Sequence, residues 1–265
     1  LEPERLDETR ARQLLGQQRG HAAELALRML GDAAQPLAHR GDGDGRPSRL
    51  GAVLDDEATD LVEANLLIAM EAYPRLDIRR WLGVIDRLAA DAAAAAPGVD
   101  GVIVALRAMG LRGDRSTYDD PRNSFVHEVL DRRLGLPISL AAITIAVAAR
   151  IGIPVVPIAL PGHVLVAERS GSEPRYLDPF DDWADRSLDD CAEIVGRLAR
   201  IPLAPEHLEP APPRQIVRRM LVNLAGSYLR RELLRDVRWA IELQAVVDPD
   251  DPGIAEQLRA LEGFD

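Results

Sequence analysis

The stretch that decides the fold is YDDPRNSFVHEVLDRRLGLPISL, residues 118–140. Its middle places apolar residues at helical spacing, and we expect Gly135 to end the helix that they form. These apolar residues are Phe125, Val126, Val129, Leu130 and Leu134. Pro137 then stands at the first turn of a second helix, which is apolar on nearly all sides up to Gly152. We therefore predict a buried central helix over residues 137–152.

Helical periodicity continues toward the N-terminus. Residues 55–74 predict a helix that begins with acidic residues and stops before Pro74, and a second helix is expected after Leu76, up to residue 95. A third helix is expected over 99–109. Residues 5–30 also have leucines at helical spacing, whereas 41–51 (GDGDGRPSRLG) has the composition of a mobile loop. The N-terminal half is therefore predicted to be helical.

The pattern changes after the central helix. Three short segments, 153–160, 163–170 and 173–180, are rich in β-branched residues and are separated by proline and glycine. Such segments are typical of strands in a small antiparallel sheet. Because the helices come first and the sheet second, we predict an α+β fold rather than a doubly wound one.

The C-terminal part is predicted to be a separate helical tail. Five prolines in residues 201–213 indicate an extended linker or a strap that wraps over the core, and helical spacing resumes at Arg214. With Pro249 as the closing proline of a tetratricopeptide unit, the packing positions are Leu221, Leu224, Ala225, Tyr228 and Ile241. One such unit cannot bury its own face, so it must dock on the core or on a partner. The expected organisation is 1–52, an N-terminal helix and loop; 53–200, the α+β domain; 201–213, the linker; and 214–265, the tail.

Composition excludes several classes of function. The 32 basic residues, all arginine, against 43 acidic ones give a net charge of -11, which argues against nucleic acids and anionic membranes as partners. The absence of lysine excludes a P-loop lysine and a Schiff base. No uninterrupted 20-residue apolar span is present, and the charged N-terminus has no signal-peptide centre, so a cytoplasmic location is expected.

Metal and cofactor motifs are missing from the sequence. The five histidines form no HxxxH or HxH pair, and Cys191 is the single cysteine, which we interpret as a small buried residue. No phosphate-binding glycine loop follows a strand. We therefore predict no metal and no cofactor, and we assign no role to His127, which falls on a polar helix face.

Three polar residues stand where they could form a catalytic triad. Ser139 lies in the first turn of the central helix, His163 begins a strand 24 residues later, and Asp178 ends the next strand after 15 more. A nucleophile at a helix N-terminus and a histidine held by a carboxylate suit nucleophilic catalysis. Each residue also has a plain structural interpretation, as a helix cap, a strand start or a turn residue.

Residues 118–140, together with ARIGIPV, PGHVLV and YLDPF, resemble the transglutaminase-like superfamily, and most closely its SirB-type bacterial branch, whose members carry a tetratricopeptide tail. The similarity covers about residues 55–260. It implies a papain-like core, in which a nucleophile at the N-terminus of a central helix faces a histidine and an aspartate on neighbouring antiparallel strands.

The resemblance places the nucleophile at Ser139, the general base at His163 and the orienting carboxylate at Asp178. Catalytic members have cysteine where this chain has serine, and a hydroxyl, unlike a thiol, cannot be held ionised at rest. Arg133, at the offset of an oxyanion-hole side chain, is a second candidate for the site, although a surface ion pair would also explain it. Asn123 is expected to cap the preceding helix or to line the cleft. Backbone N–H groups near Ile138 and Leu140 would hold the oxyanion.

Two hypotheses of function follow. In the first, the chain performs acyl transfer or hydrolysis on an amide or ester of a peptide or protein, with Ser139 attacking the carbonyl. In the second, it is a catalytically silent adaptor that binds a protein through the papain-like cleft and the helical tail. Both expect a peptide or protein as substrate or partner, and neither fixes the oligomeric state.

Overall fold

The computed structural model describes residues 50–51, 54 and 59–261. The predicted helix over 5–30 and most of the predicted loop over 41–51 lie outside these residues; Leu50 and Gly51, at the end of that loop, are helical. The described α-helices of regular length are α4 (Leu61–Ala72), α5 (Ile78–Ala95), α6 (Gly98–Met109), α7 (Val126–Arg132), α8 (Pro137–Arg150), α9 (Leu188–Ala199), α10 (Pro213–Leu229), α11 (Leu234–Val247) and α12 (Pro252–Ala260). Short 3-10 turns occur at η1 (Pro121–Ser124), η2 (Pro179–Asp181) and η3 (Pro205–Leu208).

The three helices predicted over residues 55–109 are present within the described residues as α4, α5 and α6, and side-chain caps explain the starts of α4 and α5. Asp60 accepts hydrogen bonds from the first turn of α4, and Asp77 does the same for α5. Gly110, with a φ of 85°, ends α6 in the left-handed conformation that glycine adopts without strain. The mixed helix-and-sheet class predicted from the sequence is confirmed.

Four antiparallel strands form the main sheet in the order β3 (Val155–Ile158), β4 (Leu165–Glu168), β5 (Arg175–Asp178) and β6 (Ala184–Arg186). The first three are the predicted strands. The sequence analysis missed β6, which has only three residues and no buried position. Val166 lies opposite Leu177, so the start of β4 and the end of β5 share one edge of the sheet.

The helix before the central one differs from the prediction. It ends at Arg133, which takes a left-handed φ of 63°, and not at Gly135. Gly135 lies instead in β2 (Leu134–Gly135), which pairs in parallel with β1 (Arg112–Gly113). A Cβ at residue 135 would lie 2.9 Å from Ser139 Oγ, so the glycine is required by close packing and not by a helix stop.

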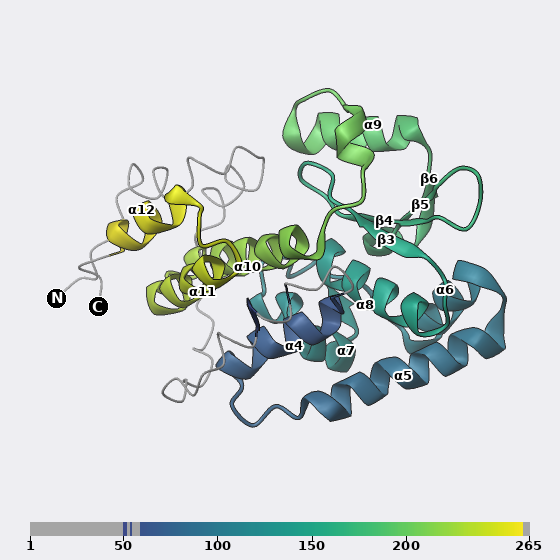
Figure 1. Ribbon diagram of the computed structural model, residues 1–265, viewed down its shortest axis with the longest axis horizontal. Helices are drawn as coiled ribbons and strands as arrows, with labels where there is room; N and C mark the ends of the chain where they lie inside the picture. The colour runs from purple at the N-terminus through teal and green to yellow at the C-terminus, as the bar shows by residue number, and fades with distance from the viewer. Residues whose placement is uncertain (1–49, 52–53, 55–58, 262–265) are drawn as a thin grey trace.

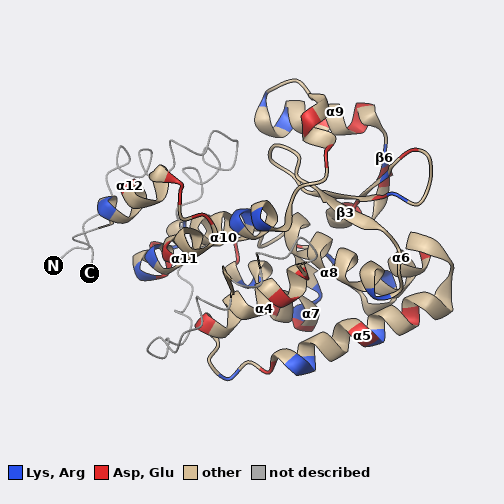
Figure 2. Cartoon of the chain, viewed as in Figure 1, with Lys and Arg blue, Asp and Glu red and all other residues tan. Residues whose placement is uncertain are grey.

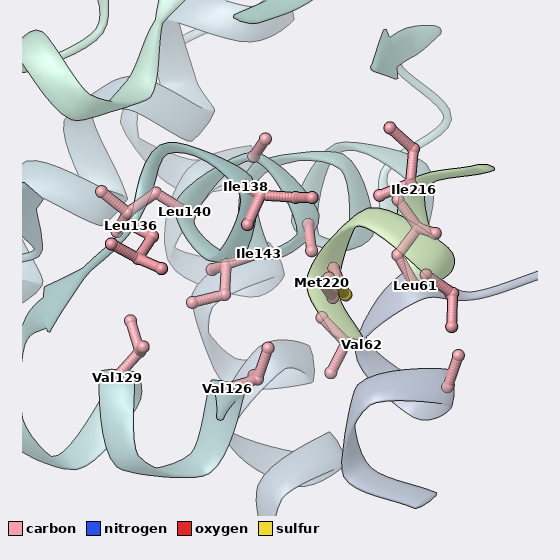
Figure 3. Close-up of a cluster of buried hydrophobic side chains, with 14 of the residues drawn as sticks. Leu61, Val62, Val126, Val129, Leu136, Ile138, Leu140, Ile143, Ile216 and Met220 are labelled. Carbon is pink, nitrogen blue, oxygen red and sulfur yellow. The ribbon is translucent and has the colours of Figure 1, made fainter. Parts of the chain in front are cut away.

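The central helix α8 is buried along most of its length, as predicted. Figure 3 shows its Ile138 and Ile143 in a cluster of apolar side chains together with α4, α7 and α10. From α10, Ile216 and Met220 are buried in this same cluster. The first helix of the predicted tail is therefore part of the main hydrophobic core.

The proline-rich segment runs along the sheet before the tail begins. Pro210 forms an isolated bridge with Ile158, and Ala211 N–H donates to Pro157 O at 3.0 Å. After this segment, α10 and α11 pack side by side beyond the sheet (Figure 1). No helix in the described part of the chain combines the length and apolar character needed to cross a membrane.

Candidate functional site

Two of the side chains predicted for the site meet at one edge of the four-stranded sheet. His163 precedes β4 and Asp178 ends the neighbouring strand β5, so the antiparallel pairing brings them together. His163 Nε2 lies 3.0 Å from Asp178 Oδ1. The turn before His163 requires glycine, because a Cβ on Gly162 would come within 2.7 Å of Leu198 Cβ on α9.

The Asp178 carboxylate is held by two further donors. Phe180 N–H donates to Oδ1 and Arg186 Nη2 donates to Oδ2, both at 3.1 Å. Burial alone would raise the pKa of Asp178, but His163 and Arg186 outweigh it and hold that pKa below its usual value. An ionised carboxylate only accepts, so His163 Nε2 carries the proton that it shares with Asp178. His163 Nδ1 makes no hydrogen bond to any described residue, which leaves it available to a ligand.

Ser139 is bonded to the backbone at the start of α8. Its Oγ accepts the Leu136 N–H at 2.9 Å and lies within donor range of two carbonyls, that of Asn123 at 2.9 Å and that of Leu136 at 3.1 Å. The side chain is fully buried. Within residues 59–261, no hydrogen bond joins Ser139 to His163. The hydroxyl therefore caps the first turn of α8, and its proton is directed to a carbonyl rather than to the imidazole.

Asn123 cross-links the interior instead of capping a helix or lining a cleft. Its Nδ2 donates to Asp114 Oδ2 at 3.0 Å and to Thr117 O at 2.8 Å, and its Oδ1 accepts from Arg132 Nη1 at 3.0 Å. The cap of η1 is Asp120. Because its amide is fully buried and bonded to protein groups, Asn123 has neither of the two predicted roles.

The groups predicted for an oxyanion hole differ in their surroundings. Arg133 is exposed, closes α7 and forms no hydrogen bond or ion pair through its side chain with the described residues. The side chains of Ile138 and Leu140 are buried. Leu140 N–H already donates to Leu136 O at 3.0 Å, so it is not free to bind an oxyanion.

Asp114 is a buried carboxylate that was not predicted from the sequence. It accepts hydrogen bonds from the backbone and hydroxyl groups of Ser116 and Thr117, and from Asn123. Burial raises the pKa of Asp114, but these hydrogen bonds outweigh that effect and lower it well below its usual range. The local sequence DRST, an aspartate followed by serine and threonine, is the turn signal that could have identified it.

A second missed feature ties the end of β5 to the central helix. Trp183 Nε1 donates to Thr144 Oγ1 at 2.9 Å, and that hydroxyl donates to Leu140 O at 2.8 Å. Asp182 and Trp183 both have left-handed backbones, with φ of 53° and 51°. The buried indole therefore anchors a strained turn that lies just after the Asp178 position.

His127 is buried, contrary to its predicted place on a polar helix face. Its ring lies 4.4 Å from the ring of Tyr73 and 5.9 Å from that of Phe125, measured between centroids. Burial lowers the pKa of His127 to about 4, so the imidazole is neutral at pH 7. Cys191 is buried as predicted, and burial raises the pKa of its thiol to about 11.

Metal-binding side chains do not gather in the described part of the chain. No group of three or more histidine, cysteine, aspartate or glutamate residues among residues 59–261 could hold a metal ion. His163 and Asp178 provide two such groups, but the Arg186 guanidinium lies against the same carboxylate and its positive charge opposes a cation there.

Comparison with known proteins identifies the family. Residues 82–222 match the family model described as transglutaminase-like superfamily. A UPF0162 protein of Xylella fastidiosa strain Temecula1 is 36% identical over 194 residues, which are 67% of this chain and 68% of that protein. A UPF0162 protein of Pseudomonas aeruginosa is 31% identical over 226 residues, covering 79% of this chain and 81% of its own length.

A eukaryotic protein matches about half of the chain. Mouse F-box only protein 21 is 27% identical over 154 residues, 53% of this chain but only 23% of that protein. No solved structure matched the chain. Proteins of very different length therefore share sequence with this chain.

Proposed function

Because the chain belongs to the transglutaminase-like superfamily and is a UPF0162 protein, we propose that it uses this fold as a peptide- or protein-binding module, with His163 and Asp178 in the binding site, and does not use Ser139 as a nucleophile. The observation that carries the proposal is the placement of the Ser139 hydroxyl, which is buried and bonded to backbone groups. A serine nucleophile must instead give its proton to a base within hydrogen-bond reach.

Rotation of the Ser139 side chain toward His163 would cost free energy. The Leu136 N–H would lose its acceptor in a fully buried environment, and an unsatisfied buried amide costs roughly 1 to 3 kcal/mol. The helix would also lose its side-chain cap at the first turn. The free Nδ1 of His163, in contrast, needs no rearrangement to accept a hydrogen bond from a ligand.

Two finer assignments form part of the same proposal. The SirB-type branch fits the order of an α+β core followed by a helix pair, and α10 with α11 would be the tetratricopeptide-like unit. Recurrence of the shared region in the much longer F-box only protein 21 fits a binding module that can be combined with other domains. A cytoplasmic location belongs to the same set of expectations.

The second candidate function is acyl transfer or hydrolysis, and the His163–Asp178 hydrogen bond favours it. In that reaction Ser139 Oγ would attack the carbonyl carbon while its proton passes to His163 Nδ1. The imidazolium would then protonate the leaving amine or alkoxide, and water would release the acyl group by the reverse proton transfers. This candidate requires a different position of the Ser139 side chain.

Labelling of the full chain with a fluorophosphonate probe separates the two candidates. We expect no labelling of the wild type, because the hydroxyl is buried and its proton is bonded to a carbonyl. Labelling that disappears in both Ser139→Ala and His163→Ala would overturn the proposal in favour of the acyl-transfer mechanism. Exposed Ser170→Ala is the matched control for non-specific labelling.

Binding is tested by selecting peptides from a displayed library on the wild-type chain. We expect selected peptides to lose affinity at least tenfold for His163→Ala and Asp178→Asn, and to keep it for Ser139→Ala. A library that yields no binder, or binders indifferent to His163, would overturn the binding-module proposal.

A further inference from the structure

Arg219 on α10 differs in its contacts from Arg218, the residue before it. Arg219 Nη1 donates to Leu160 O at 2.8 Å, and Arg219 forms no ion pair with a described carboxylate. Arg218, the preceding residue, pairs with Asp248 and Asp251, and Arg230 pairs with Asp119. The Arg219 residue is partly exposed, and its other side-chain nitrogens donate no hydrogen bond to a described residue. Figure 2 shows the basic positions of α10 on the side of the helix pair nearest the sheet.

This guanidinium is joined to the His163 turn. Leu160 O accepts both Arg219 Nη1, at 2.8 Å, and the backbone N–H of His163, at 3.1 Å. Burial lowers the pKa of Arg219 to about 10, which leaves it fully charged at pH 7. A positive charge without a neutralising carboxylate therefore lies directly beside the turn that carries His163.

Two aromatic side chains complete the surroundings. The Phe180 ring lies 6.4 Å from the ring of His163 and 5.7 Å from that of Tyr118, measured between centroids. Burial raises the pKa of Tyr118, and the nearby charge of Arg219 opposes that effect. Tyr118 nevertheless leaves 43% of its surface exposed. These contacts link His163, Phe180, Tyr118 and Arg219, and we call these four residues the Arg219 face.

We propose that the Arg219 face binds a carboxylate group of the peptide ligand, with Arg219 as the charged partner and Tyr118 and His163 as hydrogen-bonding neighbours. This inference rests on the proposed function and names the chemistry that the site recognises. A planar guanidinium with free nitrogens pairs with the two oxygens of a carboxylate. The other arginines at this edge do not compete for that ligand, since Arg115 binds Asp181 and Arg186 binds Asp178.

Acetate is the first probe, because it tests the carboxylate site without any peptide. We expect the Arg219 Nε–H signal in a ¹H–¹⁵N spectrum, assigned by its loss in Arg219→Gln, to shift saturably with acetate and not with chloride at equal ionic strength. Arg218→Gln is the matched control, because Arg218 is the adjacent residue with its charge already paired, and this variant should keep the response. No shift, an equal shift with chloride, or saturation at lower concentration with phosphate would overturn the inference.

Selected peptides then distinguish the source of the carboxylate. A C-terminal carboxylate predicts at least a tenfold loss of affinity when the peptide end is amidated; an aspartate or glutamate side chain predicts the same loss on its replacement by asparagine or glutamine. In either case Arg219→Lys should bind more weakly than wild type and Arg219→Gln more weakly still. An acetate response without any peptide binder would leave the carboxylate site standing and refute the binding-module function, whereas peptide affinity unaffected by Arg219→Gln would refute the site alone.

Discussion

Two polar regions of the molecule differ in whether their hydrogen bonds are complete. In the closed network of Asp114, Asn123 and Ser139, the carboxylate, the amide and the hydroxyl are bonded to protein groups and buried. In the open cluster of His163, Asp178 and Arg219, an imidazole nitrogen and part of a guanidinium have no described protein partner. The polar side chains of Asp114, Asn123 and Ser139 are therefore used within the fold, whereas His163 and Arg219 keep groups that a ligand can bind.

The largest expected effect comes from breaking the closed network. Asp114→Ala removes a buried carboxylate that several donors and Arg132 face, and we expect the free energy of unfolding to fall by about 3 to 5 kcal/mol. Urea unfolding measures this, with exposed Asp100→Ala as the control, for which a loss below about 1 kcal/mol is expected. Equal losses in the two variants would show that the network does not stabilise the fold.

The buried imidazole of His127 belongs to neither the closed network nor the open cluster. Because burial lowers the pKa of His127 to about 4 in the folded chain, while an unfolded histidine titrates near 6.5, the unfolded state binds the proton first as the pH falls. The neutral His127 therefore makes its full contribution to the free energy of unfolding above pH 6.5. That free energy falls by about 3 kcal/mol as the pH decreases from 6.5 to 4. His127→Leu should therefore lose less stability than wild type between pH 7 and 4.5 in urea unfolding. Parallel pH profiles would contradict the prediction.

The stability of a Ser139 variant shows whether this residue belongs to the closed network or to the open cluster. As a member of the closed network, Ser139→Ala should lower the free energy of unfolding by about 1 to 2 kcal/mol, because the Leu136 N–H loses its acceptor. Thermal or urea unfolding measures the change, and Ser170→Ala on the surface should be neutral. A variant as stable as wild type that loses a measurable activity would place Ser139 in the open cluster instead.

The smallest effect is expected in the open cluster. Arg219→Gln gives up one hydrogen bond to Leu160 O and a charge with no described counterion, so the free energy of unfolding should change by less than about 1 kcal/mol. Circular dichroism with urea unfolding checks this. A loss comparable to that of Asp114→Ala would show that Arg219 supports the fold rather than a ligand.

The elements with strong local patterns were predictable. The apolar body of α8 and its Pro137 start are visible in the sequence, and so are the β-branched segments that become β3, β4 and β5. The strand β6 was missed because its three residues bury no side chain. The end of α7 was misplaced because Arg133 adopts a left-handed conformation, which sequence preferences assign to glycine.

The site was less predictable because a polar side chain can form its hydrogen bond with a backbone group that is distant in the sequence. Ser139 was predicted as a nucleophile from its place in a helix first turn, but an available acceptor for its hydroxyl is the Asn123 carbonyl, 16 residues earlier in the chain. Arg219 follows Arg218 without any local distinction between them. Their difference arises because one faces the acidic residues near α12 and the other faces the carbonyl beside His163.

Apolar periodicity and short connections act locally, so most of the helices, the strands β3 to β5 and the burial of α8 follow from the sequence. Tertiary packing was needed to choose the capping role of Ser139 over the nucleophilic one, to make Asp114 and Asn123 interior cross-links, and to place Arg219 beside His163 without a described carboxylate partner. Hydrogen bonding and charge pairing depend on which groups from distant parts of the chain come within about 3 Å of each other, and packing alone sets those distances.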